Sequence, residues 1–422
     1  MPNAVGTPAV RKQVEALRPA AGHAAPHDSA GLLAVALLCA GAFVSARSQD
    51  HPNLCLALIV GAIALSGRAP RLRPADVAAL AVAVWAVVTR MWTVDGDTTL
   101  DAAMTYASAA LIFVAIRHLA VRVVTAYVVG GCYLLGCVLS AWGVVRAALG
   151  GNLPARSDAL DLTVRFGVEG VNLNFTAYTL ATGCLLASLL LTVRGQHWAV
   201  RALLALPLPV LACGVLLNGT KGALVALTLI PVHLLASRLS PRVALTTVSI
   251  LVPTSLILVP LGLGNDFLRQ FDTNFGQRST GDLSGRLLVW PEAIATWSDN
   301  VFLGIGAGSF PLVNSVGVGA HNLLLTVGND LGLLGLLAYA AVFALALGEY
   351  ARQSTLARQR AGLYLVTLFP IWLTGHWETA LGAWLTLGLL TALPNTPVRV
   401  GRHRRTDPVR QDLPPASGTG RP

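Results

Sequence analysis

The chain has 422 residues and a formal net charge of +10; 54% of its residues are hydrophobic and only 12% are charged. Soluble globular domains carry about a quarter charged residues, and the mean hydropathy here is +0.64. This composition excludes an ordinary soluble domain and predicts an all-α protein that crosses a membrane many times.

A polar segment rich in Ala and Pro, residues 1–30, precedes the first apolar run. Its basic residues lie far from that run, which is not the arrangement of a signal peptide. We expect this segment to be a disordered cytoplasmic tail.

Twelve apolar segments follow, and each approaches the roughly 20 residues that a membrane helix needs. The expected spans are 31–46, 52–67, 74–92, 100–116, 123–145, 171–193, 199–217, 220–237, 243–263, 320–347, 361–376 and 378–394. Nine spans therefore occupy residues 31–263 and three occupy 320–394. A long irregular stretch, 264–319, separates the two groups, and a basic tail, 395–422, follows the last span.

The positions of the basic residues orient these spans. If the N-terminus is cytoplasmic, the segments on that side carry 21 of the 30 Lys and Arg residues, as the positive-inside rule requires. Both termini are then cytoplasmic, and 264–319 becomes a large extracytoplasmic loop. We expect the basic tail to bind anionic lipid headgroups and not nucleic acid, because no aromatic residues are interleaved with its charges.

The other nine cations lie in the outer segments, against this bias, and three of them stand out by their position at or near the outer membrane face. Arg165 lies in "VRFGVEGVNLNFTAY", Lys221 in "LLNGTKGALVALTL" and Arg286 in "GDLSGRLLVWPEAIATW". A cation at the membrane face is costly unless an anion compensates it, and phosphate suits both guanidinium and ammonium groups. The alternative is pairing with a nearby carboxylate such as Glu169 or Glu292.

The large loop contains two recognisable local patterns. Arg286 and Trp290 are four residues apart and share a helical face, and Pro291 is expected to interrupt that helix or to start a second one. The segment is apolar enough to lie on the membrane surface and cap a lipid headgroup. "GIGAGSF" at 304–310 lacks the strand and helix of a nucleotide-binding loop and predicts a tight turn.

"GAHNLLLTVGNDLGLLG" places a histidine at the outer end of a span. If the helix starts near Ala320, its positive end and burial both keep the His321 imidazole neutral, as a general base must be. Asn322 would orient a hydroxyl or a sugar, or cap the helix. Asp330 falls on roughly the opposite face of a regular helix and cannot pair with His321 directly. The alternative for His321 is a packed interfacial residue.

Together, several segments resemble the O-antigen ligase family of bacterial polysaccharide glycosyltransferases. They are "SGRLLVWPEAIATWSDNVFLGIGAGSF", "AHNLLLTVGNDLGLLGLL", "RFGVEGVNLNFTAY" and "LLNGTKGALVAL", in the family's order and spacing over roughly residues 150–350. Three positions depart from the family's usual residues. Lys221 replaces Arg, Asp330 replaces Glu, and Val301 stands where Pro is common.

The resemblance implies a GT-C-like fold and a metal-independent, inverting glycan transfer at the periplasmic face of the bacterial inner membrane, with no cofactor. The donor would be a glycan on undecaprenyl diphosphate, and the acceptor a hydroxyl of lipid A–core oligosaccharide. His321 would act as the base. The residues that would bind the diphosphate are Arg286, Arg165 and Lys221. Those that would orient the substrate are Asn322, Trp290 and Asn174.

Other reactions remain open at this point. A polysaccharide polymerase would extend a lipid-linked glycan, and a protein O-oligosaccharyltransferase, usually a larger protein, would glycosylate Ser or Thr. A lipid flippase or transporter predicts internal repeats and ionisable residues near the middle of several spans. Here the ionisable residues cluster at the outer face instead, which favours the glycosyltransferase.

Overall fold

The computed structural model describes residues 29–47, 52–67, 71–120, 122–150, 165–263 and 286–393. Their regular secondary structure is entirely helical, with no strand. The expected tails fall largely outside the described residues, as does the first part of the large loop.

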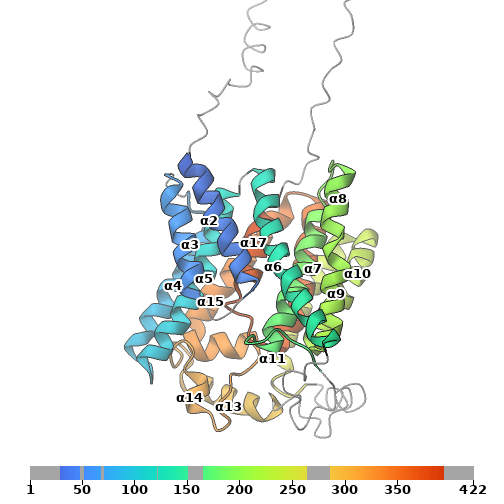
Figure 1. The fold of residues 1–422 in the computed structure, drawn as a ribbon. Coiled ribbons are helices and arrows are strands. Elements are labelled where there is room, and N and C mark those ends of the chain that lie inside the picture. Colours follow the sequence, from blue (N-terminus) through green and yellow to red (C-terminus); the bar gives the residue numbers. More distant parts are fainter. Residues whose placement is uncertain are drawn as a thin grey trace, which may run out of the picture.

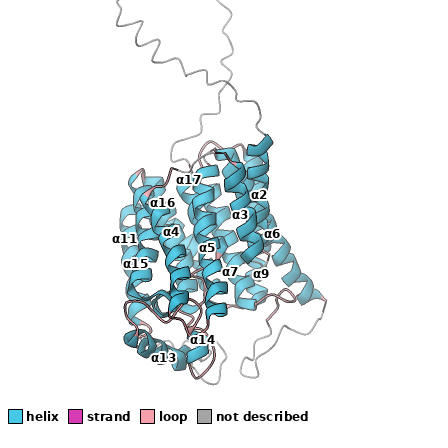
Figure 2. Ribbon diagram, turned by 90° about the vertical axis from the view of Figure 1, so that its left-hand side faces the viewer, coloured by secondary structure: helices cyan, strands magenta, loops and turns pink. Residues whose placement is uncertain are grey.

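The helices before the large loop are α2 (Ser29–Ser45), α3 (Pro52–Leu65), α4 (Pro74–Val88), η1 (Thr89–Met91), α5 (Gly96–Leu119), α6 (Val123–Leu149), α7 (Leu173–Leu191), α8 (Trp198–Ala205), α9 (Pro207–Asn218), α10 (Lys221–Leu239) and α11 (Pro241–Leu258). The later ones are α13 (Arg286–Asp299), α14 (Phe310–Val313), α15 (Leu323–Arg352), α16 (Thr355–Thr374) and α17 (Leu381–Ala392). The long helices stand side by side, and α13 and α14 lie at one end of the bundle (Figures 1 and 2).

Each expected span coincides with a helix, and 199–217 corresponds to the pair α8 and α9. In the described part of the chain, eight helical segments are long and apolar enough to cross a membrane, while α2, α3 and α17 are shorter apolar helices. The prediction of an all-α, polytopic membrane protein is therefore confirmed. The count of twelve spans stays a prediction.

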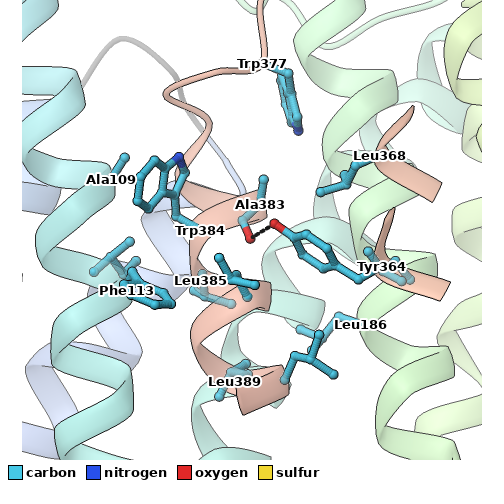
Figure 3. Close-up of a cluster of buried hydrophobic side chains, with 14 of the residues drawn as sticks. Ala109, Phe113, Leu186, Tyr364, Leu368, Trp377, Ala383, Trp384, Leu385 and Leu389 are labelled. Atoms are coloured by element: carbon cyan, nitrogen blue, oxygen red, sulfur yellow. Dashed lines mark hydrogen bonds between the residues drawn. The ribbon is translucent and has the colours of Figure 1, made fainter. Parts of the chain in front are cut away.

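The short helix α17 lies in the interior of the bundle, packed against α5 and α7 (Figure 3). Its residues are apolar nearly all round, as expected of a fully buried helix. The Trp384 ring meets Phe113 edge-on with centroids 6.1 Å apart, and the Tyr364 hydroxyl donates to the Ala383 carbonyl at 3.0 Å. The indole of Trp384 also donates to the Glu378 carbonyl at 2.8 Å. These contacts hold the segment between α16 and α17 in place.

A kink in α15 meets the glycine-rich turn that follows α13. Gly332 has φ 64°, outside helical geometry, and Gly304 in the turn has φ 70°. The two backbones are so close that a Cβ on either glycine would overlap the other segment. The Ile305 amide donates to the Asn329 carbonyl at 2.7 Å. The tight turn predicted at 304–310 is confirmed.

The prediction that Pro291 would break its helix is wrong. α13 continues through this residue without interruption. Packing of α13 against α15 explains why the missing N–H is tolerated. The Trp290 indole donates to the Ala320 carbonyl at 2.9 Å, and the Asn329 amide donates to the Ala293 carbonyl at 3.0 Å.

A buried ion pair ties α4 to α5 at the end of the bundle that we expect to be cytoplasmic. Arg117 Nε lies 3.2 Å from Asp76 Oδ1, and both side chains are almost completely buried. Removing one partner leaves the other charge buried without its counter-ion. We expect Arg117→Ala to lower the free energy of unfolding in detergent by about 3–5 kcal/mol.

The matched control for this prediction is Arg73→Ala. Arg73 pairs with Glu349 at 3.6 Å, but both side chains are about half exposed, and exposed pairs contribute about 0–1 kcal/mol. Equal losses for the two variants would show that the buried Asp76–Arg117 pair adds no more to the stability of the bundle than an exposed pair does.

Candidate functional site

His321 lies in the connecting segment just before α15. The helix begins at Leu323 and not near Ala320, so His321 precedes the capping residue. Its φ of 50° is the one positive value at a non-glycine residue in the described chain. Backbone strain of this kind costs about 1–3 kcal/mol and often marks functional sites. Asn322 is buried, and its side chain caps the helix by accepting from the Leu325 amide at 3.2 Å.

A second histidine, which the sequence analysis passed over, contacts the first. The rings of His321 and His376 have centroids 4.2 Å apart. His376 comes from the segment between α16 and α17, where its side chain is exposed and lines a cavity. It stands against the backbone of Gly319, where a Cβ would overlap the ring. The feature of the sequence that could have pointed to His376 is "GHWE", a short polar segment between two apolar segments.

Arg286, the first residue of α13, adds a positive charge near both histidines. Burial lowers the pKa of His321 to about 2, and the charges of His376 and Arg286 act in the same direction. Desolvation by the surrounding protein and the charge of Arg286 also lower the pKa of His376 below its ordinary value. Both imidazoles are therefore neutral at neutral pH. An anion bound beside them would raise their pKa values again.

Arg165 organises a second polar group at the starts of α7 and α10. Its guanidinium donates to the Asn218 carbonyl at 3.2 Å, to Asn174 Oδ1 at 3.1 Å and to the Thr220 hydroxyl. Thr220 immediately precedes Lys221, the first residue of α10. The structure thus brings Arg165 and Asn174 together with Thr220, the residue that precedes Lys221.

The segment that carries His376 touches both groups. The Tyr178 hydroxyl, on α7, donates to the Thr374 carbonyl at 3.5 Å, and the Trp377 ring lies 5.3 Å from the Tyr178 ring. Thr374 also lies against Gly222, the residue after Lys221. A single short connection therefore links the Arg165 group to the histidine pair.

An apolar groove of about 490 Å³ opens beside α15. It is bounded by residues of α11, α15 and α16, and its lining is almost entirely aliphatic and aromatic. The groove begins at Leu323, two residues after His321, and follows α15 as far as Ala351. It therefore runs along most of a membrane helix from the histidine pair.

The contact between Gly319 and His376 can be tested directly. We expect Gly319→Ala to displace the His376 ring from its place beside His321 and to lower glycan transfer by about 10²-fold, the cost of misplacing a reacting group by about 1 Å. The rate is measured with purified protein in proteoliposomes.

The control is Gly131→Ala on α6, where nothing lies within 4 Å of the added Cβ. Full activity in Gly319→Ala would show that the position of His376 does not matter for the reaction.

Comparison with known proteins gives one family match, which covers part of the chain. Residues 206–340 match the family model described as O-antigen ligase. The match covers about a third of the chain and includes Lys221, Arg286 and His321, whereas Arg165 and His376 lie outside it. A search of curated proteins gave no match. The chain is therefore an all-α, multi-pass membrane protein in which residues 206–340 match the O-antigen ligase family model.

Proposed function

We propose that this protein transfers a glycan from undecaprenyl diphosphate to an acceptor hydroxyl at the periplasmic face of the bacterial inner membrane. The observation that carries the proposal is the convergence of Arg286 and His376 with His321, two residues before Leu323, which lines an apolar groove. The ligase or polymerase type of function that the family model indicates agrees with it.

The groove suits the lipid part of such a donor. Its lining is apolar along α15, as a prenyl chain requires. Because the groove begins at Leu323, a chain lying in it would bring its diphosphate close to His321. The cation Arg286 then faces the anion that the site needs.

The chemistry follows from these positions. The acceptor oxygen attacks the anomeric carbon and gives its proton to His321, while the bond from that carbon to the diphosphate oxygen breaks and the diphosphate leaves with the electron pair. Attack opposite the leaving group inverts the anomeric configuration. Fixed cations stabilise the charge that develops on the diphosphate. In this proposal they are Arg286, Arg165 and Lys221, with no metal ion.

A bound diphosphate also adjusts the base. Its negative charge raises the pKa of His321 from the low value of the empty site, so the imidazole becomes a better proton acceptor when the donor is present. Asn322, Trp290 and Asn174 act on the substrate through the groups they hold. Asn322 caps the helix that follows His321, Trp290 holds α13 through its bond to the Ala320 carbonyl, and Asn174 orients Arg165.

Reconstitution tests the proposed function. The purified full chain is placed in proteoliposomes with the lipid-linked glycan and lipid A–core oligosaccharide. We expect glycan joined to lipid A–core. If glycan chains lengthen on the lipid instead, the protein is a polymerase, and if no glycan is transferred at all, the proposed function is wrong.

A further inference from the structure

A second cavity, of about 210 Å³, is lined in part by His376. Residues of α5, of α14 and of the first turns of α15 line it, together with the segment after α16. Unlike the apolar groove, it presents several polar side chains. The Tyr106 hydroxyl donates to Asp330 Oδ2 at 3.1 Å, and Thr326, His376 and Glu378 also line the space.

Two of these side chains have buried polar atoms without a hydrogen-bond partner in the described residues. Glu378 is only 9% exposed and Thr326 only 7%. Within the described residues, neither Oε2 of Glu378 nor the hydroxyl of Thr326 has a hydrogen-bond partner. Buried polar atoms are almost always paired. Since one water occupies about 30 Å³ of liquid, the cavity has room for a polar occupant larger than water.

The charges around the cavity select the kind of occupant. Of the described residues that line it, Asp330 and Glu378 carry carboxyl groups and none is Lys or Arg. A diphosphate finds no cation there to pair with, whereas sugar hydroxyls form hydrogen bonds with carboxyl groups and with the threonine hydroxyl. The cavity and the group around Arg286 therefore suit different partners, one hydroxylic and one anionic.

We infer that this cavity binds the sugar ring of the acceptor, with Glu378, Thr326 and Asp330 holding its hydroxyl groups. His376 lines the cavity and its ring contacts the His321 ring, and Gly319 and Ala320, just before His321, also line the space. A hydroxyl of the bound ring would thus lie near the histidine pair, while the donor approaches from Arg286 and the groove. The inference rests on the proposed function, because it divides the site into donor and acceptor halves.

Equilibrium binding without donor tests this assignment. The probes are the core oligosaccharide released from lipid A and the repeat-unit glycan released from the donor lipid. Their Kd for the full chain in detergent is followed by tryptophan fluorescence, to which Trp377 beside the cavity contributes. For whichever probe binds the wild type, we expect Glu378→Gln to raise Kd about tenfold or more and Thr326→Val to raise it severalfold.

The matched control is Thr386→Val. Thr386 lies on α17, is fully buried and also has a hydroxyl without a partner in the described residues, but it does not line the cavity. Its variant should bind like the wild type. The inference is overturned if neither probe binds, if Glu378→Gln and Thr326→Val leave Kd unchanged, or if Thr386→Val raises Kd equally.

These outcomes are separate from the fate of the proposed function. If the wild type transfers glycan but Glu378→Gln and Thr326→Val leave sugar binding unchanged, only the acceptor cavity is refuted. If both substitutions weaken sugar binding but the wild type transfers no glycan, the cavity is a sugar site and the proposed transferase function is refuted. Asp330 is omitted from the variants because it also accepts from Tyr106.

Discussion

His321→Ala is expected to lower kcat for glycan transfer by about 10²–10⁴-fold, the usual contribution of a general base. The alanine cannot take the proton of the attacking hydroxyl. Donor binding should change little, because in this account the lipid chain and diphosphate are held by the groove and by cations. Transfer in proteoliposomes gives the rate, and Kd for the lipid-linked donor is measured separately.

The control for this prediction is His197→Asn. His197 is an exposed histidine that caps α8, and asparagine can replace it as a cap. We expect wild-type activity. If His321→Ala kept more than about a tenth of the wild-type rate, the residue would not be the base, and its strained backbone would need another explanation.

Arg286→Ala is expected to lower kcat/KM for the donor by about 10²–10³-fold, the loss typical of removing one group that stabilises developing negative charge. Arg286→Lys should recover part of the activity, because it restores the charge without the planar fork of the guanidinium. Steady-state rates at saturating acceptor, with the donor varied, measure both effects.

Arg90→Ala is the matched control, since Arg90 is a cation of the same predicted outer face. Its side chain is half exposed and pairs weakly with Asp97 at 3.8 Å. We expect no change in its donor kinetics. Donor kinetics equal to the wild type in Arg286→Ala would remove this residue from the diphosphate site.

Hydropathy alone located the helices of this protein, because a membrane helix must be long and apolar wherever it occurs. It did not predict the kink within α15 or the unbroken course of α13. The kink at Gly332 depends on a backbone approach from the turn that contains Gly304, 28 residues earlier. The continuous helix through Pro291 depends on packing against α15. Both features come from tertiary contacts, which outweigh local propensity.

For the site, too, the sequence predicted some residues, and others became apparent only from tertiary contacts. The charge bias pointed to Arg165, Lys221 and Arg286, and the structure places Arg165 beside Thr220, the residue that precedes Lys221. His376 escaped attention because it is 55 residues from His321 in the sequence and only the return of α16 brings the rings together. For Asn322 the sequence left open whether it orients a hydroxyl or a sugar or caps the helix, and the coordinates show that it forms the cap.

The central claim is a transfer in which the diphosphate is the leaving group and His321 takes the proton. Its most direct test is to count undecaprenyl diphosphate released for each glycan joined to the acceptor in proteoliposomes containing a metal chelator. The account predicts one diphosphate lipid per glycan for the wild type, and a 10²-fold or greater loss of both products in His321→Ala, in line with removal of a general base. Glycan transfer without release of the diphosphate lipid, or transfer that stops when metal ions are removed, would contradict it.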